Sequence, residues 1–334
     1  MQLGRRAFLG AAGAAIAAAC APQGAGSAVT AAPSLGPPET TAIRFSGPTP
    51  CDPWTWLVGD FLKEEGFTTV ENGTGGVVTN DIAVTYANNY VASVDAGEPY
   101  VALGGTHVGC MELWALPGIN SVRDMRGKRV AVTKQDVLMD QNYGLWVSLL
   151  TTFGVDPSEV SFTFTGDPTK NPVDDFVGGR SDAVIAIGLG GAQLMANPKN
   201  PGKQIFDTSV DKPWSQYFCC LLLAKRDWNR ANPNAAKRAT RAVLRAIDYG
   251  AQDRQRAVTS AVDKKLGVAA NPAILFETIK ALPYDWRAYD PAESLRFYAL
   301  RLADAKLVKK APSQILADGT DFAFFHQMQK ELKA

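Results

Sequence analysis

Histidine and cysteine are the residue types in this 334-residue sequence that could serve as nucleophiles, general bases or metal ligands. There are two histidines, His107 and His326, and five cysteines. His107 lies three residues before Cys110, and Cys219 and Cys220 are adjacent, so either pair could be reactive. The sequence has no Cys-x2-Cys spacing, no His-Glu-x-x-His motif, no phosphate-binding loop and no nucleophile elbow. We therefore expect no catalytic residue, no metal ligand and no cofactor.

Four cysteines lie in the part of the chain that should fold. A domain of this size does not need disulfides to fold, although an exported protein meets an oxidising compartment. The sequence leaves a disulfide open and does not indicate its pairing. We favour four buried free thiols, at Cys51, Cys110, Cys219 and Cys220.

Hydroxyl, amide and aromatic side chains follow several short apolar runs of the sequence. Loops in such places can hold the polar groups of a ligand, because hydroxyls and backbone N–H groups are free to donate there. The candidates for ligand binding are Ser46, Thr49, Trp56, Thr85, Tyr86, Asn88, His107, Gln135, Asp136 and Gly188.

Each of these candidates also has a structural alternative. Ser46 and Thr49 could form a turn, Asn88 could cap a helix, and Tyr86 could pack in a core. His107 could equally be a buried histidine that is hydrogen-bonded within the fold. Both interpretations stay open at this point.

Apart from Lys134, the candidate loops contain no lysine or arginine. A sulfonate or phosphate would then depend on helix N-termini and hydroxyls instead of a charged clamp. The sequence therefore favours a neutral or weakly polar organic ligand.

Short strands and longer helices alternate along the chain. This alternation predicts parallel sheets covered by helices on both faces, with ligands at the carboxyl ends of the strands. Prolines at 233, 272 and 291 are expected to begin helices. The expected strands are 41–45, 68–71, 81–85, 100–103, 129–132, 160–165, 183–187 and 218–224, and the expected helices before residue 218 are 54–65, 88–95, 139–153 and 172–177.

The first twenty residues have the features of an export signal. Arg5 and Arg6 precede Phe8 and Leu9, and a weakly apolar stretch ends in small residues. This order is similar to the twin-arginine signal, which exports proteins already folded. The apolar segment is shorter than the roughly 20 residues that a membrane-spanning helix needs. We expect residues 1–20 to be a twin-arginine-type export signal with its cleavage box, and not part of the folded protein.

Cys20 follows three alanines and could be lipidated after cleavage. Residues 21–41 are almost all small or turn-forming and should form a flexible linker. The protein would then be anchored to the outer face of the cytoplasmic membrane. Cleavage at an Ala-x-Ala site would instead release it into the periplasm.

Composition indicates a globular protein of two domains. Lysine and arginine number 34 and aspartate and glutamate 33, for a net charge of +1, and 46% of residues are hydrophobic. This nearly neutral balance gives no sign of the basic surface that nucleic-acid binding requires. About 290 residues follow the linker, which suits two domains of typical size.

Two stretches around the centre of the sequence resemble the nitrate/sulfonate/bicarbonate-type ABC substrate-binding proteins, the SsuA/THI5-like or NMT1-like group. The first is residues 95–113, and the second is residues 119–132, which contain Asp124-Met125-Arg126-Gly127-Lys128 before an apolar strand. Further similar segments are residues 215–220, 226–228, 289–298 and 315–321.

The resemblance implies a type II periplasmic-binding-protein fold with two Rossmann-like lobes and a two-strand hinge. Lobe one would comprise residues 42–132 and 222–334, and lobe two residues 133–221. The chain would be a monomer that delivers a small organic or oxyanion solute to an ABC permease, and His107 would border the cleft. The glycines at 188, 190 and 191 depart from the bulkier residues of related proteins, which leaves the ligand open.

Two other functions remain as alternatives. The group includes pyrimidine-synthesis-like enzymes, and a ligand-sensing subunit of a membrane receptor would have the same fold. Two histidines and the absence of catalytic motifs disfavour an enzyme.

Overall fold

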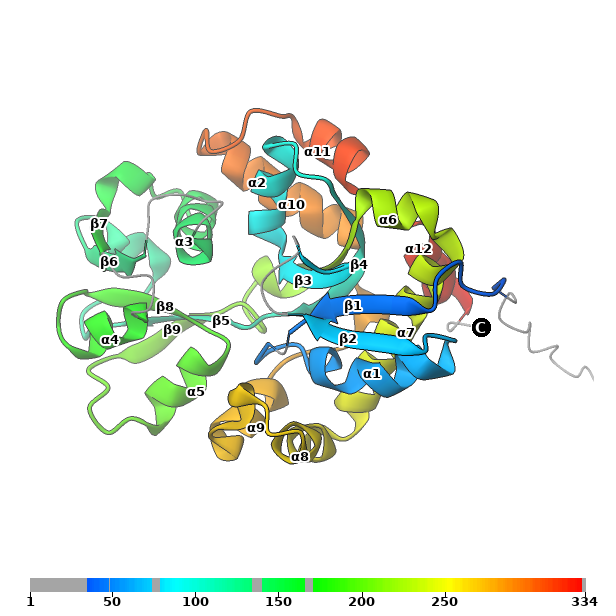
Figure 1. Cartoon of the computed structure of the whole chain (residues 1–334). Coiled ribbons are helices and arrows are strands. Elements are labelled where there is room, and N and C mark those ends of the chain that lie inside the picture. The colour runs from blue at the N-terminus through cyan, green and yellow to red at the C-terminus, as the bar shows by residue number, and fades with distance from the viewer. Residues whose placement is uncertain (1–34, 48, 74–78, 134–139, 166–170, 332–334) are drawn as a thin grey trace, which may run out of the picture.

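Two α/β lobes make up the computed structural model of this chain (Figure 1). The structure describes residues 35–47, 49–73, 79–133, 140–165 and 171–331. Each lobe has one five-stranded sheet with helices packed around it. Lobe one consists of the sheet that contains β1 (Ala42–Ser46) and the helices packed on that sheet. Lobe two consists of the sheet that contains β6 (Arg129–Val132) and the helices packed on it. The expectation of an α/β fold with two lobes is confirmed.

The sheet of lobe one has the strand order β2-β1-β3-β10-β4. β1 pairs in parallel with β2 and β3, whereas β10 runs antiparallel to β3 and β4. The sheet is therefore mixed, and the expectation of purely parallel strands is corrected, because β10 enters from the other lobe. The strands are β1 (Ala42–Ser46), β2 (Thr69–Gly73), β3 (Ile82–Tyr86), β4 (Tyr100–Val108) and β10 (Phe218–Lys225).

The sheet of lobe two has the order β7-β6-β8-β5-β9. β6 is parallel to β7 and β8, and β5 is antiparallel to β8 and β9. The strands are β5 (Met111–Ala115), β6 (Arg129–Val132), β7 (Ser161–Phe164), β8 (Ala183–Ile187) and β9 (Lys203–Asp207). Each sheet thus contains one strand that arrives directly from the other lobe.

The chain crosses between the lobes twice. The first crossover is Gly109 and Cys110, which join β4 to β5 with φ angles of 89° and 72°. The second comprises residues 208–217, between β9 and β10. The boundaries expected near 132 and 221 are therefore corrected: β5 and β6 pair within the second sheet, so residues 111–132 belong to lobe two, and residues 218–221 belong to lobe one.

Helices cover both sheets, and most begin where the sequence indicates. Prolines 233, 272 and 291 each stand at the first position of a helix, as expected. Lobe two contains α3 (Gln141–Thr152), α4 (Pro172–Val177) and α5 (Leu189–Ala196). Lobe one contains α1 (Trp54–Glu64), α2 (Ala87–Asp95), α6 (Arg226–Ala231), α7 (Pro233–Gln252), α8 (Arg254–Asp263), α9 (Pro272–Lys280), α10 (Pro291–Asp304), α11 (Pro312–Gly319) and α12 (Ala323–Glu331).

Two glycines in the middle of β4 make room for aromatic rings. A Cβ atom added at Gly104 would overlap the ring of Phe325, and one added at Gly105 would overlap the ring of Phe218. Both rings are fully buried in the core of lobe one. β4 therefore continues through the glycine pair to Val108, beyond the end expected at residue 103.

The first described residues pack against lobe one. Glu39 accepts hydrogen bonds from the backbone N–H groups of Asn234 and Ala235 at the start of α7, and Arg238 donates to the carbonyl of Leu35. The linker expected over 21–41 is therefore corrected for residues 35–41, which are held on α7. The expected signal at 1–20 and the lipidation site Cys20 lie outside the described residues. Within the described residues, no helix combines the length and the apolar character that crossing a membrane requires.

Candidate functional site

The two lobes face each other where loops and helix N-termini of one meet those of the other. Asn88, at the start of α2, donates a hydrogen bond from Nδ2 to the carbonyl of Gln141, at the start of α3, over 3.4 Å. A Cβ atom added at Gly188 in lobe two would lie 3.5 Å from Cβ of Pro50 in lobe one. We call the junction between these two pairs the cleft. In this structure the lobes are in contact across it.

Gly188 forms its part of the cleft with backbone alone. Its φ of 58° and ψ of −114° are angles that glycine adopts far more readily than other residues. Its N–H donates to the carbonyl of Cys110 in the first crossover over 3.1 Å. α5 starts at the next residue and was not among the helices expected from the sequence.

The end of β3 brings further candidates to the cleft. Thr85 and Tyr86 are its last residues, and the Tyr86 hydroxyl lies 4.0 Å from Sγ of Cys51. Asn88 is 1% exposed, and its Oδ1 has no hydrogen-bond partner. The hydroxyl of Ser46 stabilises the sheet, because its Oγ accepts a hydrogen bond from the N–H of Val84 over 3.2 Å.

Thr49 and Trp56 differ in their position relative to the cleft. Thr49 lies in the turn next to Pro50, and its N–H donates to Oγ1 of Thr55 over 3.0 Å. Trp56 is 3% exposed, and its indole N–H donates to the carbonyl of Ala257 on α8. The indole of Trp56 is thus held in the core between helices, so we leave it out of the proposed site.

His107 lies inside β4 and is 1% exposed. Its Nδ1 is 3.1 Å from the carbonyl oxygen of Val108, and its Nε2 is 3.4 Å from Oδ2 of Asp52, which is equally buried. Burial disfavours the charged imidazole, but the Asp52 carboxylate outweighs burial and raises the pKa of His107 well above its ordinary value. His107 therefore belongs to the buried wall behind the cleft.

The thiols of Cys51, Cys110, Cys219 and Cys220 are all free and buried, as the sequence predicted. The sulfur atoms of Cys110 and Cys219 are 2.9 Å apart. A hydrogen bond with Cys110 raises the pKa of Cys51 to about 12, and burial raises the pKa of Cys110 to about 12. The thiols of Cys51 and Cys110 are therefore poor nucleophiles at neutral pH, since the thiolate is the reactive form. Against the effect of burial, hydrogen bonds with Cys110 and Cys220 lower the pKa of Cys219.

The other two candidates, Gln135 and Asp136, lie outside the described residues. The segment that contains them joins Thr133, after β6, to Asp140, which caps α3. Their part in a site stays a prediction.

The sequence of this chain was compared with protein families. The profile of the family described as NMT1/THI5 like matches residues 70–257, more than half of the chain. The chain belongs to the NMT1/THI5-like family. A search of curated proteins gave no match.

Solved structures similar to this NMT1/THI5-like protein include two bacterial binding proteins and one enzyme. The alkanesulfonate-binding protein SsuA from Xanthomonas axonopodis pv. citri, bound to MOPS, has a TM-score of 0.67 at 14% identity, over 85% of this chain and 99% of that one. The periplasmic nitrate-binding protein NrtA from Synechocystis PCC 6803 has a TM-score of 0.69 at 13% identity, over 89% and 90%. The desulfurization enzyme DSZB has a TM-score of 0.59 at 12% identity, over 87% and 99%. These similarities establish the type II periplasmic-binding-protein fold.

A small hollow lies beside the cleft of this NMT1/THI5-like protein, between α5 of lobe two and α9 of lobe one. Its volume is about 30 Å³, which is room for one or two water molecules. An organic solute can enter it only if the lobes move apart. Its lining includes Cys110, Glu112, Gly188, Asp207, Ser209 and Leu282.

Glu112 gives this hollow an acidic side chain. Its Oε2 accepts a hydrogen bond from the indole of Trp114 over 2.8 Å. Burial raises the pKa of Glu112, against the effect of that hydrogen bond. No lysine or arginine lines the hollow among the described residues.

A larger hollow of about 690 Å³ lies between α3 and the end of α10. Its wall includes Asp156, which caps the following turn through Ser158, and Lys306 in a left-handed turn. These groups already serve the turns that carry them. We therefore place the functional site at the cleft and not in this larger hollow.

Residues that the sequence did not single out also form the cleft. Pro50, Gln141 and Glu112 face it, and none belongs to a recognisable motif. For Pro50 and Gln141, their position next to an expected strand or helix could have indicated a place at the cleft. Pro50 follows the first strand, and Gln141 begins a helix after an aspartate that can cap it.

Proposed function

We propose that this protein is an extracytoplasmic solute-binding protein, whose lobes close on a small molecule and present it to an ABC permease. The observation that carries this proposal is a pair of lobes joined by two short crossovers and in contact across a cleft. Lobes joined in this way can move apart and together as bodies. A ligand that contacts both lobes favours the closed state by its higher affinity for that state.

The solute that we propose is neutral or positively charged. The hollow beside the cleft is lined by the carboxylates of Glu112, Asp207 and Glu277 and by no cationic side chain that the structure describes. Asp207 is satisfied by Ser209, and Glu277 pairs with Lys280. Glu112 has only the Trp114 indole as a hydrogen-bond partner among the described contacts. A sulfonate or nitrate placed here would meet this carboxylate without a counter-charge, so the hollow is unfavourable for the anions named for the similar structures.

We propose that the protein works in the periplasm or on the outer face of the cytoplasmic membrane. The twin-arginine-type sequence at residues 5–9 supports export, and Cys20 supports a lipid anchor. Labelled palmitate should be incorporated by the wild type and not by a Cys20→Ala variant. Equal labelling of both proteins would contradict the anchor and leave a released protein.

The solute-binding proposal is tested by thermal denaturation of the purified protein with candidate solutes. The set should include cationic and neutral organic molecules, pyrimidines, sulfonates, nitrate and bicarbonate. A true ligand at 100 times its Kd stabilises the protein by about 2.7 kcal/mol, which raises Tm by several degrees. Small-angle scattering should show compaction with the same solute and not with the others.

Variants of the cleft show whether the solute binds there. Asn88→Ala and Tyr86→Phe remove polar groups at the cleft, and each should reduce the rise in Tm. Asn229→Ala is the matched control, because Asn229 lies on α6 and pairs with Asp321 away from the cleft. If all three variants respond to solute like the wild type, the cleft is not the binding site.

An enzymatic function is distinguished by the fate of the solute. The similarity to a desulfurization enzyme makes this comparison necessary. After prolonged incubation, mass spectrometry should recover the solute unchanged, because all four thiols are buried and those of Cys51 and Cys110 are protonated at neutral pH. Turnover of the solute would replace the binding-protein proposal with an enzyme.

A further inference from the structure

Four side chains from three separate parts of the sequence converge at the base of the cleft. Cys51 lies in the turn between β1 and α1, and His107 lies near the end of β4. Cys110 lies in the first crossover, and Cys220 lies in β10, opposite His107 in the register of the two strands. We call these four residues the thiol–imidazole cluster.

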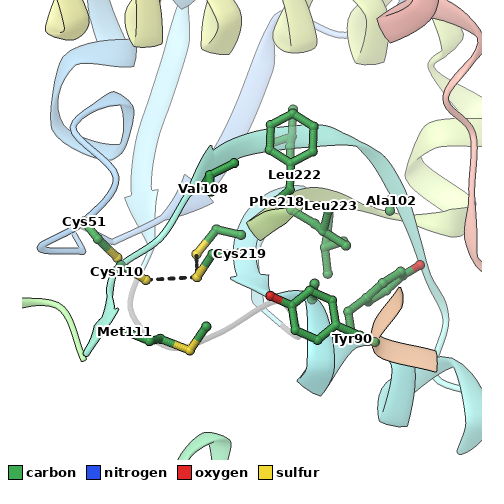
Figure 2. Close-up of a cluster of buried hydrophobic side chains, with 14 of the residues drawn as sticks. Cys51, Tyr90, Ala102, Val108, Cys110, Met111, Phe218, Cys219, Leu222 and Leu223 are labelled. Carbon is green, nitrogen blue, oxygen red and sulfur yellow. Dashed lines mark hydrogen bonds between the residues drawn. The ribbon is translucent and has the colours of Figure 1, made fainter. Parts of the chain in front are cut away.

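The donor atoms of the cluster are close together and shielded from water. One ligand atom from each residue, three sulfurs and a ring nitrogen, all lie within 4.8 Å of one another. The four residues are between 1% and 7% exposed. Figure 2 shows the side chains of Cys51 and Cys110 on neighbouring segments of the chain, with Cys219 beside Cys110.

Both ring nitrogens of His107 face a buried acceptor, so the nitrogen that binds an ion has to give up one acceptor and keep the other. Metal-binding histidines usually place one ring nitrogen on the ion and the other on a carbonyl or carboxylate. Here Nδ1 lies against the Val108 carbonyl, and Nε2 lies 3.4 Å from Oδ2 of Asp52. Both side chains are 1% exposed, and neither Nε2 nor this Oδ2 makes a hydrogen bond to a residue that the structure describes.

Two tyrosine side chains pack against the cluster. The Tyr86 hydroxyl is 4.0 Å from Sγ of Cys51, and the Tyr284 hydroxyl donates to the Cys51 carbonyl over 2.9 Å. The rings of Tyr284 and His107 meet edge to face, with centroids 5.6 Å apart. Buried surroundings of this kind exclude water and suit a resident ion with no open coordination position.

We propose that the thiol–imidazole cluster is a binding site for a closed-shell thiophilic cation, Zn²⁺ or Cu⁺. Three cysteines and one histidine form a donor set of four-coordinate structural Zn²⁺, and soft sulfur ligands also select Cu⁺. Metal–ligand bonds of about 2.0–2.3 Å require the donors to draw together around the ion. Ca²⁺ and Mg²⁺ are not suited to the site, because they take oxygen ligands. Each thiol that binds the ion releases its proton to solvent.

The bound ion joins three segments that control how the lobes are connected. It links the turn after β1 to the first crossover through Cys51 and Cys110, and to β10 through Cys220. It would therefore fix the floor of the cleft. This inference does not depend on the proposed solute, since a resident ion is held whether or not the cleft contains a ligand.

Cys219 offers a matched control for the site. It is as buried as Cys220, and its Sγ lies 2.9 Å from Sγ of Cys110 and 3.7 Å from Sγ of Cys220. It is nevertheless outside the group of donors that are mutually close. A serine at this position removes a thiol from the same strand without removing one of the four ligands.

The test measures the metal content of the full chain, purified without a histidine tag under oxygen-free, reducing conditions. The protein is incubated with Zn²⁺ or with Cu⁺, dialysed against a weak chelator and analysed by elemental mass spectrometry. The wild type and Cys219→Ser should retain one ion per chain, and Cys110→Ser and Cys220→Ser should lose it. Asp52→Asn should lower the affinity about 10–100-fold, as loss of a group that orients a ligand does.

A second measurement keeps the result clear if a variant folds poorly. Co²⁺ bound to the wild type should show thiolate charge-transfer bands and the strong visible absorption of a tetrahedral site. Circular dichroism reports whether each variant is folded, and His107→Gln provides a further ligand variant. The proposal is overturned if the wild type retains neither Zn²⁺ nor Cu⁺, if folded Cys220→Ser retains as much ion as the wild type, or if Cys219→Ser loses the ion. A disulfide between Cys110 and Cys219 in the protein as purified would also overturn it.

Discussion

Replacement of Gly105 by alanine tests how closely β4 and β10 pack next to the first crossover. The Cβ atom of alanine would overlap the ring of Phe218, which is fully buried in β10. Phe218 has little freedom to move, because its ring already meets Tyr289 and Phe325 edge to face. The added methyl group must therefore displace either the ring or the strand.

Two opposing effects determine how much Gly105→Ala changes the free energy of unfolding. Overpacking of a well-packed core costs about 1–3 kcal/mol. Alanine also restricts the unfolded chain, which stabilises a protein by about 0.4–1 kcal/mol where the backbone allows it. The overlap involves three atoms of a buried ring, so we expect the first effect to win. The net expectation is a loss of about 1–2 kcal/mol in the free energy of unfolding.

Urea denaturation followed by tryptophan fluorescence measures this change. The matched control is Gly59→Ala in α1, where an added Cβ meets no atom within 4 Å. That substitution should stabilise the protein by about 0.5–1 kcal/mol, because glycine is unfavourable inside a helix. The same chemical change should thus have opposite signs at the two positions.

A double-mutant cycle identifies the cause. In a Phe218→Leu background the smaller side chain should leave room for the methyl group, so Gly105→Ala should become close to neutral. An equal loss in both backgrounds would refute the argument from ring packing, and so would a stabilising effect of Gly105→Ala alone.

Three further predictions concern other parts of the molecule. Glu65→Ala should lower the free energy of unfolding by about 3 kcal/mol, because Glu65 is a buried carboxylate that pairs with three arginines of α7. Glu64→Ala, at the exposed neighbouring position, should cost about 1 kcal/mol or less, and equal losses in urea denaturation would contradict this prediction. Hydrogen bonds from Arg129 lower the pKa of Asp182, so its contribution is present above the ordinary pKa and is lost as pH falls through the depressed value. Asp182→Asn should therefore be less stable than the wild type by up to about 1 kcal/mol at neutral pH. In urea denaturation this difference in stability should shrink below about pH 3.9, and a difference that stays constant with pH would speak against the ion pair. Gly188→Ala should cost about 1–3 kcal/mol from backbone strain at a φ of 58°, and an unchanged denaturation midpoint would rule that strain out.

Local patterns in the sequence predicted most strands and helices of the fold. The first strand, α1 and the helices that begin with proline lie within one or two residues of their expected positions. Apolar periodicity and proline position act over a few residues, so they could be recognised without the tertiary structure. The family resemblance supplied the two-lobed arrangement, which periodicity alone does not contain.

The errors arose where tertiary pairing decides the structure. β5 has a short apolar sequence after a left-handed turn, and its place in lobe two depends on its pairing with β8 and β9. α5 was not expected, and Gly191 within it leaves room for the carboxylate of Glu112, which a Cβ atom at this position would overlap. Trp56 was expected at the cleft, but α8 covers the face of α1 that carries it. None of these partners is near its residue in sequence.

The cysteines show most clearly why spacing along the chain was an insufficient guide. Metal motifs are recognised when most ligands share one or two short turns. Here only His107 and Cys110 are close in sequence, and Cys51 and Cys220 come from other parts of the chain. The register of the sheet provides the missing relation: β10 lies between β3 and β4, so Cys220 has Tyr86 on one side and His107 on the other. The crossover then returns Cys110 to the same end of the sheet, where Cys51 follows β1. The cluster is therefore a consequence of strand order, and a search for such sites in this fold should compare residues by their position in the two crossovers and not by their separation in sequence.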